Sequence, residues 1–269
     1  MDEKILLNIY NNLEKGRSSA LAVITHENGS APRGSGSIMS IDEDGKTIGS
    51  IGGGKVEYLV VNKAVDCIEK GQDYNFEYKL NDQGGLGMKC GGEVKGYIRV
   101  FKPKDKLIIA GAGHIGEKMN NLAKIMDFHT VIIDDRDEYA NRERFSEADE
   151  IIASDIGSAI EACVTNNNTY IVIATSGYEQ DKAALKAAVN KENAYIGMIG
   201  STNKIRTIMK ELIEEGISEE KLRKVYAPMG INISSNLPEE IALGILSEIL
   251  LLKNKGTLEH RKALKKVWD

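Results

Sequence analysis

Residues 107–119 read LIIAGAGHIGEKM, and this stretch decides the fold. A short apolar run, which predicts a buried strand, leads directly into Gly111, Gly113 and Gly116, spaced as G-x-G-x-x-G. The spacing alone is a weak signal. Its position between a strand and the start of a helix is what a Rossmann βαβ unit requires.

Each glycine has a physical role in a dinucleotide site of this kind. Gly111 permits the tight turn, Gly113 lets the backbone approach a diphosphate, and Gly116 allows the helix to pack closely on the strand. The helix N-terminus offers N–H groups and the positive end of its dipole to the anion. The alternative is a Rossmann domain that has lost its ligand and keeps these glycines for packing alone.

An acidic residue completes the pattern. VIID, residues 131–134, predicts a second strand ending at Asp134, which follows Gly111 by 23 residues. Asp134 would accept a hydrogen bond from a ribose hydroxyl, which favours an unphosphorylated ribose, although Arg136 leaves that preference open. The sequence therefore predicts NAD or another dinucleotide as a ligand of this domain.

Strands and helices alternate along the chain from Lys106 onward, with a helix expected even over DEYANRERF, residues 137–145. Strands this apolar suit a parallel sheet covered by helices on both faces. Residues 104–269 are therefore predicted to form a Rossmann-like domain. A linker is expected at residues 103–105.

Residues 1–103 show a different pattern. The first residues have apolar side chains at helical spacing, which predicts an amphipathic helix, and a short β-rich apolar run predicts a strand after it. A hairpin with its turn at Asp44-Gly45, a helix ending at Gly71 and two further strands are expected next. The fold class predicted for the chain is α/β, with a C-terminal Rossmann-type parallel sheet domain and a smaller N-terminal α+β domain.

The composition excludes several classes of protein. The 269 residues carry a formal net charge of −5, which argues against a nucleic-acid-binding protein. No apolar run is long enough to span a membrane, and the first residues lack the features of a signal peptide. Cys67, Cys90 and Cys163 lie far apart, as in proteins of a reducing compartment. We expect a cytoplasmic protein, with Cys67 and Cys163 in the core.

The N-terminal domain has its own concentration of glycine, arginine and cysteine. The loop around Arg33, the triplet Gly52, Gly53 and Gly54, and Cys90 within KCGGE are the candidate binding residues. Successive backbone N–H groups of glycine turns hold anions, and arginine pairs with phosphate through two hydrogen bonds. The alternative is that each loop is only a tight turn of a small β domain.

Cys90 has three interpretations. A catalytic nucleophile would need a base within hydrogen-bond reach, and no histidine lies nearby in the sequence. A buried turn cysteine would be inert. A contact to a metal-bearing cofactor fits the flanking glycines, and Lys89 would lower the thiol pKa if the two side chains converge.

Several motifs together resemble the XdhC/CoxI family of xanthine dehydrogenase accessory proteins. In chain order they are GSAPRGSGSIM, GSIGGGKVEY, CGGEV, IIAGAGHIG, IIDDR, YIGMIGS and INISSNLPEEIALGILSEIL. The similarity runs from Ser19 to Leu251. The chain departs from many members at Lys89, where they have a second cysteine, and at residues 175–181, TSGYEQD, where they have a histidine-rich stretch.

The resemblance implies a two-domain, dimeric cofactor chaperone that is not an enzyme. It would bind the molybdenum cofactor, protect it during sulfuration and deliver it to a molybdenum hydroxylase apoenzyme, with a cysteine desulfurase as a further partner. Cys90 would contact the molybdenum–sulfur end, while Arg33 and the Gly52–Gly54 turn hold the phosphate end. The rival predictions are an NAD-linked oxidoreductase and a nucleotide-responsive Rossmann regulatory protein.

Overall fold

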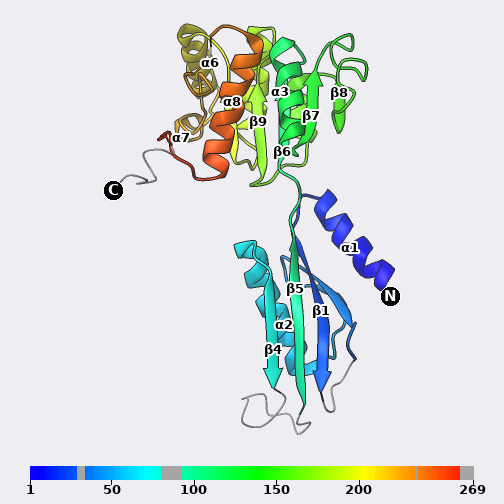
Figure 1. Ribbon diagram of the computed structural model, residues 1–269. Helices are drawn as coiled ribbons and strands as arrows, with labels where there is room; N and C mark the ends of the chain where they lie inside the picture. Colours follow the sequence, from blue (N-terminus) through cyan, green and yellow to red (C-terminus); the bar gives the residue numbers. More distant parts are fainter. Residues whose placement is uncertain (29–33, 80–91, 234, 261–269) are drawn as a thin grey trace. The chain divides into compact units, whose positions relative to one another are not determined.

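The computed structural model describes residues 1–28, 34–79, 92–233 and 235–260. The chain forms two compact units, Met1–Pro103 and Lys104–Asp269, and each is described by itself (Figure 1). Within the described residues, no helix has both the length and the apolar character needed to cross a bilayer.

The N-terminal unit is built on a five-stranded antiparallel sheet with the strand order β3-β2-β1-β5-β4. Its strands are β1 (Ser19–Asn28), β2 (Ile38–Asp42), β3 (Thr47–Gly49), β4 (Tyr74–Lys79) and β5 (Glu93–Phe101). Gly45 has a φ of +75°, and Asp42 Oδ1 accepts hydrogen bonds from the N–H groups of Asp44 and Lys46. The expected hairpin turn at Asp44-Gly45 is confirmed.

Two helices pack on opposite faces of this sheet. Helix α2 (Gly54–Lys70) covers the face that carries Ala20, Ala22 and Ile41, and it ends at Gly71 in the left-handed conformation (φ +62°). Helix α1 (Asp2–Glu14) contacts β2 from the other face, where Asn12 Nδ2 donates to Ser19 Oγ at 2.9 Å. The apolar core of this unit therefore lies between α2 and the sheet.

The C-terminal unit is built on a five-stranded parallel sheet with the strand order β10-β9-β6-β7-β8. Its strands are β6 (Lys106–Ala110), β7 (His129–Asp134), β8 (Glu150–Ala153), β9 (Thr169–Ile173) and β10 (Tyr195–Met198). The chain runs outward from the central β6 in one direction and returns to its other side at β9. The carboxyl ends of β6 and β9 therefore flank the switch point, where open α/β sheets bind ligands.

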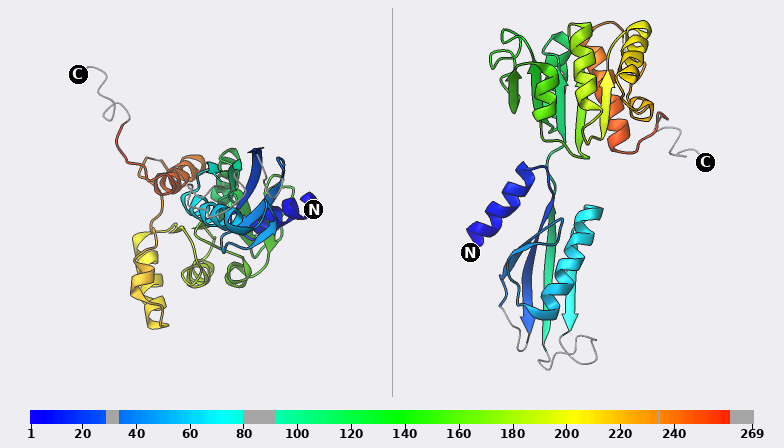
Figure 2. Two further views of the ribbon diagram at one scale, coloured as in Figure 1. Left: turned by 90° about the horizontal axis from the view of Figure 1, so that it is seen from below. Right: turned by 180° about the vertical axis from the view of Figure 1, so that it is seen from behind.

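Helices cover both faces of the parallel sheet (Figures 1 and 2). Helices α3 (His114–Ile125) and α8 (Pro238–Lys253) pack on one face. The other face carries α4 (Ile156–Ala162), α5 (Tyr178–Ala188), α6 (Thr202–Glu214) and α7 (Glu219–Leu222). The predicted α/β fold class with a C-terminal Rossmann domain is confirmed.

The helix expected over residues 137–145 is wrong, because this segment between β7 and β8 forms turns. Asn141 supplies a physical reason. Its Nδ2 donates to the carbonyls of Asp137 (3.1 Å) and Glu138 (2.9 Å). Asparagine side chains that bond to nearby backbone in this way compete with helical hydrogen bonds.

Candidate functional site

The turn between β6 and α3 needs glycine at two positions because of packing. Gly111 has a φ of +117°, and a Cβ there would lie 2.2 Å from the Ala174 carbonyl oxygen. A Cβ on Gly116 would lie 2.1 Å from the Gly111 carbonyl oxygen. Backbone atoms cannot move aside for a methyl group as a flexible side chain can. These two glycines are therefore required by the fold itself, with or without a ligand.

Gly113 is different, since a Cβ there would meet no heavy atom within 4 Å. It is the N-cap residue of α3, and among the described residues no side chain caps that helix end. The N–H groups of the first turn, which have no partner within the helix, and the positive end of the helix dipole therefore lie beside an open position. The turn has room for a ligand at Gly113, and the binding of a dinucleotide diphosphate there stays a prediction.

Asp134 lies at the end of β7 and is 1 % exposed. Its Oδ2 accepts from Ala112 N–H at 2.7 Å and from Arg136 Nη2 at 3.0 Å. Its Oδ1 accepts from Arg136 N–H at 3.1 Å and from Arg136 Nε at 2.8 Å. Burial alone would raise the pKa of Asp134, but the hydrogen bonds from Arg136 and Ala112 lower it below its ordinary value. The carboxylate is ionised and links β7 to the glycine turn.

Arg144, which the sequence did not single out, supports the same turn. Its Nη1 donates to the Ala112 carbonyl at 2.8 Å, and its Nη2 lies 3.2 Å from Glu117 Oε2. Two guanidinium groups lie over the ring of Tyr139, with Arg136 3.8 Å and Arg144 5.0 Å from its centroid. Nothing in the spacing of these residues predicts the arrangement, because the segment between β7 and β8 forms turns whose contacts are set by side chains.

A second polar group lies at the switch point. Asp181 is fully buried in the first turn of α5 and accepts from the Thr175 hydroxyl at 2.5 Å. Its Oδ2 lies 2.5 Å from the amine of Lys204, a partly exposed residue of α6. Thr175 adjoins the glycine turn, since a Cβ on Gly111 would lie 2.9 Å from its nitrogen. Lys204 was missed from sequence because only the fold brings α6 beside α5.

The Gly52–Gly54 turn in the N-terminal unit is already bonded to a carboxylate. All three glycines have positive φ angles, between +61° and +134°. Glu57 Oε2 accepts from the Ser50 hydroxyl at 2.7 Å, from Gly53 N–H at 3.0 Å and from Ile51 N–H at 3.3 Å. The turn does hold an oxyanion, and that oxyanion belongs to the chain. A ligand phosphate here would have to replace Glu57.

Arg33 and Cys90, the two side chains expected to complete this N-terminal site, lie outside the described residues. The other two cysteines are structural. Cys67 is buried in the N-terminal core and Cys163 packs half-buried against the C-terminal core. Burial raises the pKa of both thiols. In the part of the chain that is described, no cluster of histidine, cysteine and carboxylate side chains could hold a metal ion.

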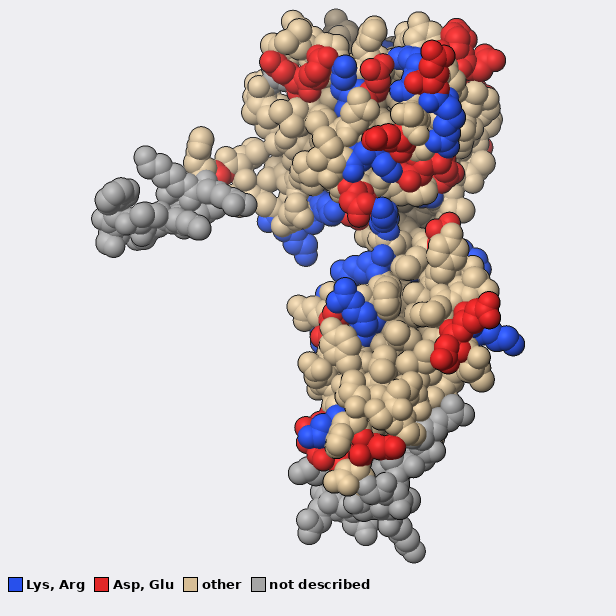
Figure 3. Space-filling model, turned by 45° about the vertical axis from the view of Figure 1, so that its right-hand side comes forward, with Lys and Arg blue, Asp and Glu red and all other residues tan. Residues whose placement is uncertain are grey.

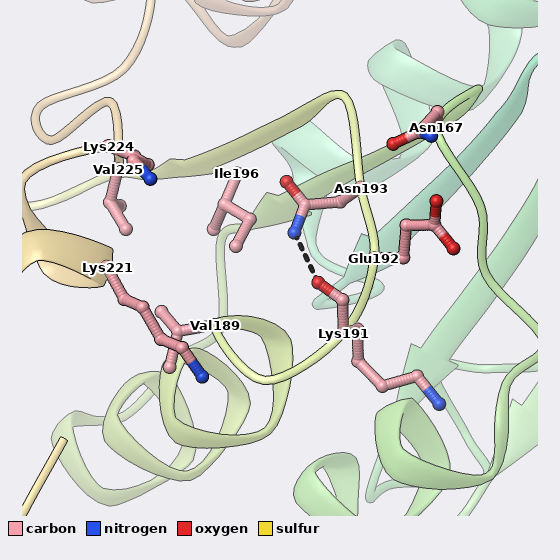
Figure 4. A pocket seen from close by; sticks show the side chains of 9 residues that line it. All are labelled: Asn167, Val189, Lys191, Glu192, Asn193, Ile196, Lys221, Lys224 and Val225. Carbon is pink, nitrogen blue, oxygen red and sulfur yellow. Dashed lines mark hydrogen bonds between the residues drawn. The ribbon is translucent and has the colours of Figure 1, made fainter. Parts of the chain in front are cut away.

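A cavity of about 280 Å³ lies at the opposite end of the parallel sheet, before β9 and β10 (Figure 4). Three lysines line it, but each amine has its own partner. Lys191 Nζ donates to the Glu161 carbonyl, Lys221 Nζ to Asn190 Oδ1 and Lys224 Nζ to Glu220. Because each amine is bonded to a partner of its own, the three lysines do not form one anion site.

The face shown in Figure 3 mixes acidic and basic side chains over the Rossmann unit. Ion pairs in this unit include Lys124 with Asp149 (2.7 Å) and Arg144 with Glu117 (3.2 Å). Mixed, paired charge of this kind does not form the continuous basic surface that a nucleic-acid backbone requires.

Two family models match the chain in order. The model described as the XdhC and CoxI family matches residues 12–79, and the one described as the XdhC Rossmann domain matches residues 107–249. The second match corresponds to the unit built on the parallel sheet, and it covers more than half of the chain.

Three curated proteins are similar to this chain. The uncharacterized protein YqeB of Escherichia coli is 31% identical over 88% of this chain and 44% of its own length. A Bacillus subtilis protein described as a probable xanthine dehydrogenase subunit is 26% identical over 59% of this chain and 46% of its own length. The molybdenum cofactor insertion chaperone PaoD of Escherichia coli is 19% identical, with 88% of this chain and 84% of that protein covered.

The chain thus spans less than half the length of the first two relatives. Among solved structures, one described as a xanthine dehydrogenase from Bacillus halodurans is similar, with a TM-score of 0.50 and 20% identity. The match covers 94% of this chain and 96% of the chain in that structure. At this identity the likeness concerns the fold alone.

Proposed function

Because this chain belongs to the XdhC and CoxI family, we propose that it is an accessory protein that binds the molybdenum cofactor and delivers it to the apoenzyme of a xanthine dehydrogenase-type hydroxylase. The observation that carries this proposal is the ordered match of both family models. A relative named as a molybdenum cofactor insertion chaperone, 84% of whose length is covered, supports it.

The N-terminal unit is the part proposed to hold the cofactor. The cofactor is a pterin with an ene-dithiolate and a phosphate or diphosphate, so it needs anion-binding groups at one end and a soft ligand at the other. Cys90 is proposed as the thiolate that contacts the molybdenum–sulfur end. Arg33 and the Gly52–Gly54 turn are proposed for the phosphate end, where Glu57 now marks an oxyanion position.

The proposed partners follow from this role. They are the hydroxylase apoenzyme, a cysteine desulfurase that supplies sulfur, and a second copy of the chain in a homodimer, all in the cytoplasm. The rival functions make different predictions. An NAD-linked oxidoreductase would turn over a nicotinamide with a substrate, and a nucleotide-responsive regulator would bind nucleotide without affinity for the molybdenum cofactor.

Cys90→Ser tests the proposal in cells that lack the native protein. Serine keeps the shape of the side chain but replaces a thiolate with a harder, protonated oxygen. We expect the variant to accumulate as a folded protein and to leave hydroxylase activity at least several-fold below the wild-type level.

Cys163→Ser is the matched control, because Cys163 packs half-buried against the Rossmann core and has no proposed role in cofactor binding. It should restore activity as the wild type does. Full hydroxylase activity with Cys90→Ser would show that the thiolate has no role and that Cys90 is a turn residue.

A further inference from the structure

Asp134, at the end of β7, has no free acceptor for a ribose hydroxyl. A carboxylate provides about four acceptor positions on its two oxygens. On Asp134 all four are taken, two by Arg136 side-chain nitrogens, one by Arg136 N–H and one by Ala112 N–H. In a Rossmann site that selects an unmodified ribose, this carboxylate must accept from the sugar. Asp134 is therefore not free for the role that the sequence predicts.

The guanidinium of Arg136, beside Asp134, offers hydrogen-bond donors instead. A guanidinium carries five N–H donors, and the fork to Asp134 uses only Nε and one hydrogen of Nη2. Within the described residues no group accepts from Nη1 of Arg136. The side chain is 31% exposed, so its remaining donors can be reached from solvent. This balance of donors and acceptors suits an oxyanion better than a hydroxyl group.

The Arg136 guanidinium is also held in place before any ligand arrives. Asp134 binds one edge of it in a bidentate pair, and the ring of Tyr139 lies 3.8 Å from its central carbon. Arg144 fixes the segment that carries Tyr139 by donating to the Ala112 carbonyl. A preorganised cation loses little conformational freedom when it binds an anion.

We propose that Arg136 makes the Rossmann unit selective for a dinucleotide with a 2′-phosphorylated ribose over one with an unmodified ribose. The diphosphate would lie on the open Gly113 turn, and the ribose phosphate would meet the free edge of Arg136. Cofactor delivery by the N-terminal unit is not needed for this selectivity, so either function can fail without the other.

Asp135 opposes this selectivity. Its Oδ1 lies 3.8 Å from Arg136 Nε, and its side chain is 38% exposed beside the position given to the phosphate. Gln180 Nε2 lies 3.4 Å from the other oxygen of Asp135. Removing the negative charge of Asp135 should strengthen binding of the nucleotide with a 2′-phosphate and leave binding of the nucleotide with a 2′-hydroxyl group almost unchanged. Asp135→Asn is therefore a useful partner for Arg136→Gln.

The test is the affinity of the full chain for NADPH and for NADH, measured by calorimetry. We expect wild type to bind NADPH at least about tenfold more tightly, the ratio that one charged hydrogen bond provides. Arg136→Gln should abolish this preference by weakening NADPH binding and freeing Asp134 for NADH. Asp135→Asn should increase the preference, and Gly113→Val should remove binding of both nucleotides from a folded protein.

The ratio of NADPH affinity to NADH affinity of the wild-type protein tests the proposal even if a variant fails to fold. NADH binding as tight as NADPH binding, or tighter, would overturn the proposal. So would the absence of binding of either nucleotide at millimolar concentration, since the glycine turn would then hold no dinucleotide. An unchanged NADPH preference in a folded Arg136→Gln variant would equally overturn the role of Arg136.

Discussion

In each of two glycine turns of this chain, a carboxylate side chain accepts a hydrogen bond from a backbone N–H group of the turn. The two turns differ in whether the N-terminus of the following helix is left without a cap. In the Rossmann unit, Asp134 comes from a separate strand and accepts from Ala112 N–H, and no side chain in the described part of the chain caps α3 at Gly113. In the N-terminal unit, Glu57 belongs to the helix that follows the turn and takes the N–H of Gly53, the N-cap residue itself.

The difference shows that glycines in such turns can be required for different physical reasons. At Gly111 and Gly116 the absence of a Cβ relieves contacts with backbone, and only Gly113 faces open space. In the Gly52–Gly54 turn positive φ angles require glycine, and the N–H groups of Gly52 and Gly53 are bonded to Ser50 and Glu57. An anion proposed to bind at Gly113 would meet an open position, whereas one proposed to bind at Gly53 would have to displace Glu57.

Replacing Gly111 with alanine should give the largest effect on stability. The new methyl group would meet the Ala174 carbonyl in a backbone conformation with φ of +117°. We expect the free energy of unfolding of the Rossmann unit to fall by at least about 3 kcal/mol, from strain and overpacking together. Urea denaturation of the full chain, followed by circular dichroism, measures the change.

Gly113→Ala is the matched control in the same turn, because its methyl group would meet nothing within 4 Å. It should change the free energy of unfolding by less than about 1 kcal/mol. Equal destabilisation by the two substitutions would contradict the distinction between Gly111, which packing requires, and Gly113, which has open space beside it.

Replacing Glu57 with alanine should have a smaller effect, confined to the N-terminal unit. The change removes the acceptor for Gly53 N–H and the Ser50 hydroxyl, which should cost about 1–2 kcal/mol in the free energy of unfolding. Glu57→Gln keeps an acceptor oxygen and should lose less. Thermal unfolding of both variants measures this, and an alanine variant as stable as wild type would show that the bonds contribute nothing.

Much of the Rossmann unit could be predicted from the sequence, because its signals are local. Apolar runs gave the parallel strands, and the spacing of Gly111, Gly113 and Gly116 placed the first turn and helix correctly. The segment over residues 137–145 failed because a helical count of apolar residues ignores side chains such as Asn141 that bond to the backbone.

The site was less predictable, because its polar contacts join residues that are distant in sequence. Asp134 was placed at the right strand end, but no pattern reveals that Arg136 occupies its acceptors. Arg144 and Lys204 reach the carboxyl edge of the sheet only through the packing of segments that carry no motif. Glu57 lies four residues from Gly53, and the spacing alone does not show which way its side chain turns.

We propose that the two units bind different ligands, the molybdenum cofactor in the N-terminal unit and a nucleotide in the Rossmann unit. The most direct measurement is the molybdenum and pterin content of the full chain purified from cells that make the cofactor, alongside its NADPH affinity. Cys90→Ser should lower molybdenum and pterin several-fold and leave NADPH binding unchanged, and Gly113→Val should do the reverse. Wild-type protein without molybdenum or pterin, or both ligands lost together in either folded variant, would contradict the account.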